Sequence, residues 1–130
     1  MTRFAPVAVL ALALLGTARA ADPTTDTLDT VKKNLADGKA VLVDVRELAE
    51  WKGGHLKGAK HLPLSELKAG TDAEKLNKLL PEKGAVYLHC AAGKRCLVAA
   101  DILKKQGYDV RPLKDGFDAL VKAGFPEDKR

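Results

Sequence analysis

The sequence predicts an α/β fold, in which one domain has a largely parallel central sheet flanked by helices. Between residues 28 and 123, short apolar, β-branched segments alternate with amphipathic helical patterns, which is the order expected of strand–helix units. The two clearest strands, 41–45 and 85–88, are apolar almost throughout, as in parallel strands buried on both faces. The length of 130 residues suffices for one compact domain.

The domain is expected to begin with a flexible polar segment, 22–27, and a short amphipathic helix. Leu28, Val31 and Leu35 recur at helical spacing, and the following Asp-Gly pair stops the pattern. The sequence Val-Leu-Val-Asp-Val at 41–45 then predicts the central strand.

The middle of the chain alternates less regularly. Residues 47–58 contain two adjacent glycines and are expected to form a turn region. A weak strand at 59–62 follows, closed by Pro63. Leucines at helical spacing predict a helix at 73–80, which Pro81 ends.

The last part of the chain predicts a strand, a loop, a helix, a strand and a final helix. Strand 85–88 leads through a loop of small residues into helix 97–106, which Gly107 ends. A strand at 108–113 and a short helix at 117–123 complete the expected domain.

Residues 1–20 have the features of a secretory signal peptide, so we predict that the domain comprises residues 21–130. Arg3 is a basic start, Val7 to Leu15 is an apolar run too short to span a bilayer, and Ala18-Arg19-Ala20 has small residues at the cleavage positions. We therefore expect an exported protein, periplasmic if its source is a Gram-negative bacterium, with no membrane attachment after cleavage. An uncleaved membrane anchor is the alternative.

The charge balance argues against nucleic acid as a partner. The formal net charge of the full chain is +5, from 22 basic and 17 acidic residues, and it falls to +3 when Arg3 and Arg19 are removed with the signal peptide. The lysines are scattered among acidic residues, without a basic run interleaved with aromatic side chains. This pattern is typical of an ordinary solvated surface.

Cys90 is the candidate nucleophile. It follows a predicted strand and precedes Ala91, Ala92 and Gly93, whose small side chains allow backbone N–H groups to turn toward the sulfur. The next helix adds the positive end of its dipole. Such surroundings lower the pKa of a thiol from about 8.5 and produce a reactive thiolate. The alternative is an inert, buried thiol.

Three further loop residues are candidates for the substrate site. Lys94 and Arg95 are expected to bind the oxyanion of a substrate and to lower the thiol pKa, the alternative being a solvated loop rim. Cys96 follows them. Two cysteines in an exported chain usually form a structural disulfide, but Cys90 and Cys96 enclose only a very short loop, where the entropic gain is least.

Asp44 and Arg46 lie at the carboxyl end of the central strand, the side on which open α/β sheets bind ligands. We interpret them as a supporting pair that holds neighbouring loops rather than as catalytic groups. His55, His61 and His89 are not spaced like metal ligands, and no metal site is predicted.

Several segments resemble those of the rhodanese (sulfurtransferase) family. Residues 41–47, Glu50-Trp51 and 54–59 are similar to its first signature, residues 90–96 to its active-site loop, and residues 113–117 to its closing glycine turn. Each segment alone is a weak signal. Together, in this order, they cover nearly the whole predicted domain, so the chain resembles a single-domain rhodanese.

The resemblance implies a thiosulfate sulfurtransferase that needs no metal or organic cofactor. Cys90 would take sulfane sulfur from thiosulfate or a similar small anionic donor as a persulfide and pass it to cyanide or a thiol. The substrate-binding residues would then be those that follow it in the loop: Ala91, Ala92, Gly93, Lys94, Arg95 and Cys96. The alternative function is a sulfur carrier or binding module that hands persulfide sulfur to a protein partner.

The spacing after Cys90 separates this interpretation from a rival one. Related phosphatases and arsenate reductases resemble the fold but place an arginine six positions after the cysteine, whereas here Arg95 is at position five and Cys96 at position six. The rhodanese family usually has Ser or Thr at the latter position. Cys96 can therefore replace that hydrogen-bond donor, or it can attack the persulfide, releasing sulfide and leaving a disulfide.

Overall fold

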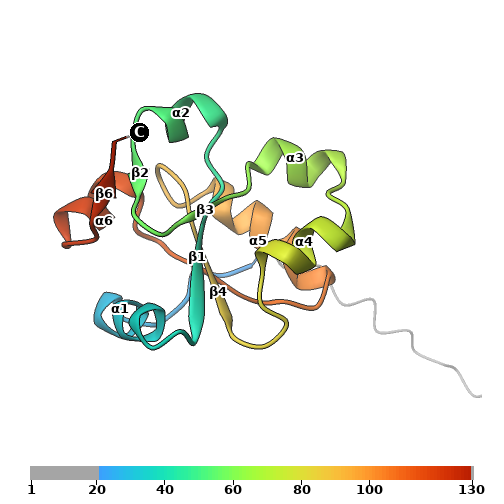
Figure 1. The fold of residues 1–130 in the computed structure, drawn as a ribbon, viewed down its shortest axis with the longest axis horizontal. Helices are drawn as coiled ribbons and strands as arrows, with labels where there is room; N and C mark the ends of the chain where they lie inside the picture. Colours follow the sequence, from blue (N-terminus) through green and yellow to red (C-terminus); the bar gives the residue numbers. More distant parts are fainter. Residues whose placement is uncertain (1–20, 130) are drawn as a thin grey trace, which may run out of the picture.

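The central sheet has four parallel strands in the order β3-β1-β4-β5, as shown by a computed structural model that describes residues 21–129 (Figure 1). Both central strands are paired along their whole length, from Ala40 opposite Ala85 to Asp44 opposite His89. The predicted fold class is thereby confirmed, and the predicted signal peptide lies outside the described residues. The strands are β1 (Ala40–Asp44), β3 (Lys60–His61), β4 (Ala85–His89) and β5 (Asp109–Pro112).

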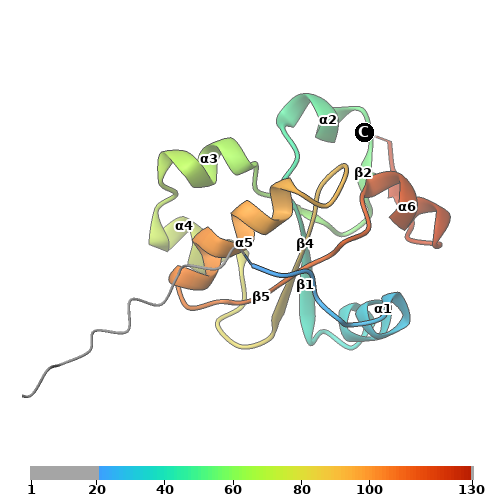
Figure 2. The same ribbon diagram turned by 180° about the vertical axis from the view of Figure 1, so that it is seen from behind.

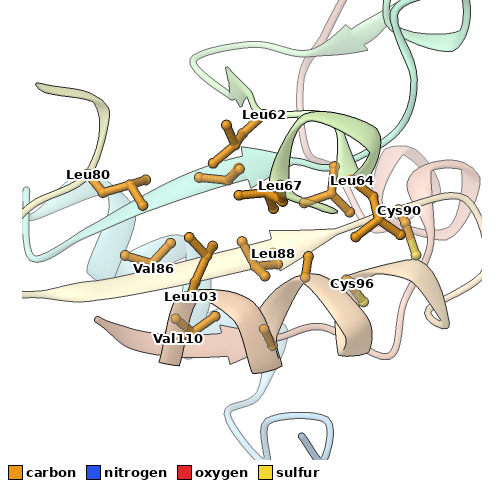
Figure 3. Close-up of a cluster of buried hydrophobic side chains, with 14 of the residues drawn as sticks. Leu62, Leu64, Leu67, Leu80, Val86, Leu88, Cys90, Cys96, Leu103 and Val110 are labelled. Atoms are coloured by element: carbon orange, nitrogen blue, oxygen red, sulfur yellow. The ribbon is translucent and has the colours of Figure 1, made fainter. Parts of the chain in front are cut away.

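Helices cover both faces of this sheet (Figures 1 and 2). One face packs against α3 (Leu64–Ala69), α4 (Ala73–Leu79) and α5 (Arg95–Lys105), and the other against α1 (Leu28–Ala36) and α6 (Phe117–Lys122). Successive residues of each central strand enter opposite cores because side chains alternate along a strand. Figure 3 shows the core between the sheet and α5.

The hydrophobic periodicity of the sequence predicted the two longest helices correctly. In α1, Val31 is fully buried, and the Thr27 side chain caps the helix by accepting a hydrogen bond from the Thr30 amide at 3.2 Å. In α5, Ala99 and Leu103 are fully buried against the sheet. This helix begins directly after the loop that follows Cys90.

Other elements differ from the sequence-based expectation. Within the expected turn region lies α2 (Leu48–Lys52), whose start is stabilised by a reciprocal capping box between Glu47 and Glu50. Helix α3 was not predicted, and it begins immediately after Pro63. The antiparallel ribbon of β2 (His55–Leu56) and β6 (Glu127–Asp128) was also missed, because it joins segments far apart in the sequence. Within residues 21–129, no helix is long and apolar enough to cross a membrane.

Candidate active site

Cys90 follows β4 at the carboxyl edge of the sheet, and its sulfur lies in a ring of backbone amides. The Gly93 amide donates a hydrogen bond to Sγ at 3.1 Å. The backbone amides of Ala92 and Cys96 also contribute to lowering the pKa of this thiol. The small residues after Cys90 predicted inward-pointing amides, and the Gly93 amide points at the sulfur in this way.

The Cys96 thiol also contacts Gly93, through the carbonyl oxygen of that residue. Its Sγ is 3.2 Å from the Gly93 carbonyl oxygen and 3.3 Å from that of Leu113, and the thiol lowers the pKa of Cys90. Cys90 is only 1% exposed and Cys96 is fully buried, and both are free thiols. Figure 3 shows the two sulfurs at the same end of the core.

The two thiols differ in acidity because their surroundings favour the charged form of Cys90 and disfavour that of Cys96. The pKa of Cys90 is lowered to about 5, first by the Cys96 thiol and then by the surrounding amides, which together outweigh burial. The pKa of Cys96 is raised by its hydrogen bond to Cys90 and by burial. At neutral pH, therefore, Cys90 is the thiol that ionises and Cys96 keeps its proton.

The segment after β5 fixes the shape of the Cys90 loop. The Phe117 amide donates to the Cys90 carbonyl at 2.9 Å. A Cβ atom on Gly116 would lie 1.8 Å from the Ala91 carbonyl oxygen, so no side chain fits there. Gly93 has φ +84°, and a Cβ on it would lie 2.7 Å from the Lys114 carbonyl oxygen. Both glycines are therefore required for the loop to close over the sulfur.

The two cations of the loop have different surroundings. Lys94 is exposed at the amino end of α5. Arg95 forms a bidentate ion pair with Glu50 of α2, with Nη1–Oε1 and Nη2–Oε2 distances of 2.6 and 2.8 Å. This guanidinium lowers the pKa of Glu50 to about 2. The sequence analysis did not include Glu50 among the site residues, although its capping-box spacing from Glu47 could have marked the start of a helix here.

Asp44 and Arg46 form a buried ion pair at the carboxyl end of β1. Arg46 Nη2 is 2.9 Å from Asp44 Oδ2 and also donates to the Gly54 carbonyl at 2.8 Å. Its guanidinium carbon lies 4.0 Å above the centre of the Phe117 ring. The pair thus connects the end of β1 with the loop before β2 and with the start of α6.

The three histidines do not form one cluster: His89 lies beside Asp44, whereas His55 and His61 lie beside Trp51. His89 is fully buried, with Nε2 3.7 Å from Asp44 Oδ2, and burial lowers its pKa. His55 and His61 both stack on Trp51, with ring centroids 3.6 and 4.7 Å from it. Among residues 21–129 no group of three or more His, Cys, Asp or Glu side chains is arranged to hold a metal ion.

This combination of a parallel α/β sheet and a cysteine in an amide-lined strand-to-helix loop defines a class of cysteine-centred α/β domains. Comparison with known proteins agrees with it: the Rhodanese-like domain family matches residues 27–123. The chain belongs to this family, which confirms the resemblance drawn from its motifs.

Two bacterial relatives and one solved structure illustrate the similarity. YqhL of Bacillus subtilis, an uncharacterized protein, is 42% identical over 80 residues, which are 61% of this chain and 59% of YqhL. The putative sulfur carrier protein YrkF of the same organism is 36% identical over 73 residues, 56% of this chain and 36% of YrkF. The human single-domain sulfurtransferase TSTD1 has 26% identity and a TM-score of 0.63, over 78% of this chain and 97% of TSTD1.

Proposed function

We propose that this protein is a sulfurtransferase that moves sulfane sulfur from thiosulfate, or a similar small anionic donor, to cyanide or a thiol through a persulfide on Cys90. The observation that carries the proposal is the Cys90 sulfur itself, which accepts a hydrogen bond from the Gly93 amide at 3.1 Å and has its pKa lowered to about 5 by the Cys96 thiol and the surrounding amides. The similarity to a protein named as a sulfurtransferase and to one named as a putative sulfur carrier supports it.

In the first step, the Cys90 thiolate attacks the outer sulfur of thiosulfate. A new S–S bond forms on Cys90, the S–S bond of thiosulfate breaks, and sulfite leaves with the bonding electron pair. The terminal sulfur of the resulting persulfide carries the negative charge. Amide donors at the loop stabilise this anion as they stabilise the thiolate, so the protein needs no cofactor to hold it.

In the second step, the acceptor removes the terminal sulfur. Cyanide attacks that sulfur, the persulfide S–S bond breaks, and thiocyanate leaves while the Cys90 thiolate is regenerated. A thiolate acceptor reacts in the same way and leaves as an organic persulfide. Lys94 at the exposed rim provides a charge that attracts an anionic donor.

The decisive experiment combines turnover with intact mass. Purified protein treated with thiosulfate should gain the mass of one sulfur atom and should lose it again when cyanide is added, with formation of thiocyanate. Cys90→Ser should abolish both signals and keep the fold, as judged by circular dichroism. Retention of most of the activity by this variant would show that Cys90 is not the nucleophile.

The similarity to YrkF also supports a second candidate function, that of a sulfur carrier that hands its persulfide to a protein partner. In that case Cys90 would still gain sulfur from a donor. Thiocyanate formation would be negligible, however, and the persulfide sulfur on Cys90 would move only to a protein acceptor. The same mass experiment therefore distinguishes the carrier from the enzyme.

A further inference from the structure

The backbone nitrogen of Ala21 is bound to a carboxylate of the folded domain. It lies 2.7 Å from Oδ1 of Asp101, in the middle of α5. Ala21 is only 6% exposed and packs into the core between the sheet and α5. Figure 2 shows this first described segment starting next to α5 and leading toward α1.

The rest of this segment is held as firmly, contrary to the flexibility expected of residues 22–27. The Thr24 amide donates to the Pro112 carbonyl at 2.7 Å. Asp26 accepts hydrogen bonds from the Tyr87 hydroxyl at 2.7 Å and from Arg111 Nη1 at 2.9 Å. Ala21, Thr24 and Asp26 are thus each bound to the folded domain, and the position of the Ala21 nitrogen is part of the fold.

The sequence directly before Ala21 has small residues, Ala18 and Ala20, at the positions that a signal peptidase requires. We propose that the peptide bond between Ala20 and Ala21 is the processing site and that the new amino terminus pairs with Asp101. Hydrolysis would consume one water molecule, leaving a carboxylate on Ala20 and an amine on Ala21. That amine takes up a proton at neutral pH, because α-amino groups have pKa values of about 7.7–8.0.

Processing would then strengthen a bond that already exists. The amide of the unprocessed chain donates a neutral hydrogen bond to Asp101, whereas the ammonium of the processed chain donates a charge-assisted one. Because Asp101 is on α5, the ion pair would tie the new amino terminus to the helix that begins at the Cys90 loop. Asp101 is therefore a recognition residue for the mature terminus, independent of the sulfur chemistry.

The test begins with expression of the full chain in an export-competent bacterial host. Intact mass should show a product that begins at Ala21, and Ala20→Phe should block its formation because a large residue does not fit the cleavage position. A product that begins elsewhere, or an unprocessed product, would overturn the proposal.

The second part measures thermal unfolding of the processed wild type, Asp101→Asn and Asp37→Asn, each beside its unprocessed form obtained with Ala20→Phe. Asp101→Asn should lower the Tm of the processed chain on the order of 4 °C more than that of the unprocessed chain. Asp37→Asn, at an exposed carboxylate after α1, should lower both equally. An equal effect of Asp101→Asn on both forms would show that the ammonium makes no ion pair there.

A chemical readout covers the case in which the unprocessed chain is insoluble. The α-amine of the processed wild type should react with an amine-specific reagent at pH 7 at least about threefold more slowly than that of Asp101→Asn, because a paired ammonium releases its proton less readily. Equal labelling rates would overturn the proposal.

Discussion

Glu50 holds the guanidinium of Arg95 in a bidentate ion pair, with N–O distances of 2.6 and 2.8 Å. The pair links α2 to the first residue of α5, beside the loop that surrounds Cys90. Both side chains are about one third exposed, at 36% for Glu50 and 34% for Arg95, so solvent screens the pair only in part. The positive charge of Arg95 is thus largely offset, and Lys94 is left as the exposed cation of the loop.

The first prediction concerns this offset. Glu50→Gln removes a negative charge next to the loop, so the KM for the dianion thiosulfate should fall by about two- to fivefold. The decrease should shrink at high salt, because the interaction is electrostatic. Glu66→Gln is the matched control: it breaks an exposed ion pair with Lys75 on α3 and α4 and should leave KM unchanged. A KM that Glu50→Gln does not alter would show that Glu50 only anchors α2.

Arg95 itself should act on donor binding. Arg95→Ala removes a cation and leaves Glu50 unpaired beside the loop, so the KM for thiosulfate should rise by about three- to tenfold while kcat falls less. Steady-state kinetics with thiosulfate and cyanide would measure both constants. An effect on kcat alone would show that Arg95 stabilises the transition state. No effect on either constant would show that Arg95 is only a solvated residue at the edge of the loop.

A third prediction follows from the acidity of Cys90. Iodoacetamide reacts with the thiolate, so the alkylation rate should rise with pH and reach half of its maximum near pH 5. Because the Cys96 thiol is the largest cause of this low pKa, Cys96→Ala should move the midpoint upward by at least about one pH unit. A midpoint near that of a free thiol in the wild type would contradict the stabilisation of the thiolate.

The sequence was sufficient for the Cys90 loop because backbone donors need only small side chains and a following helix. The buried strands were equally readable from their apolar runs. Glu50 could not be found as a partner of Arg95, because the pair depends on how α2 packs beside α5, and that packing is not encoded in local spacing. Helix α3 was missed because only Leu64 and Leu67 repeat at helical spacing in it, whereas the equally short α6 has Phe117, Leu120 and Val121.

The fourth prediction decides between the two roles of Cys96. An attack on the Cys90 persulfide requires a thiolate at Cys96, but burial and the charged Cys90 sulfur raise the pKa of this thiol. We therefore expect Cys96 to act as a hydrogen-bond donor, as a serine would. After thiosulfate treatment, wild type and Cys96→Ser should carry an equally long-lived persulfide by intact mass. A Cys90–Cys96 disulfide with release of sulfide, found only in the wild type, would show instead that Cys96 resolves the persulfide.

The last prediction concerns Gly116, whose backbone at φ −81° would accept any residue but whose surroundings would not. A Cβ atom here would lie 1.8 Å from the Ala91 carbonyl oxygen, so the Cys90 loop would have to move. Gly116→Ala should lower the free energy of unfolding in urea by about 1–3 kcal/mol. It should also slow persulfide formation, since the amides would no longer converge on the sulfur.

Gly53→Ala provides the matched control for this substitution, because the contacts of a Cβ atom at Gly53 begin at an ordinary 3.5 Å. It should therefore leave persulfide formation unchanged. If Gly116→Ala matched Gly53→Ala in both stability and rate, the contact between the 113–117 segment and the Cys90 loop would not be what shapes the site. A slower rate at unchanged stability would show that the loop shifts without cost to the fold, so that the contact serves catalysis alone.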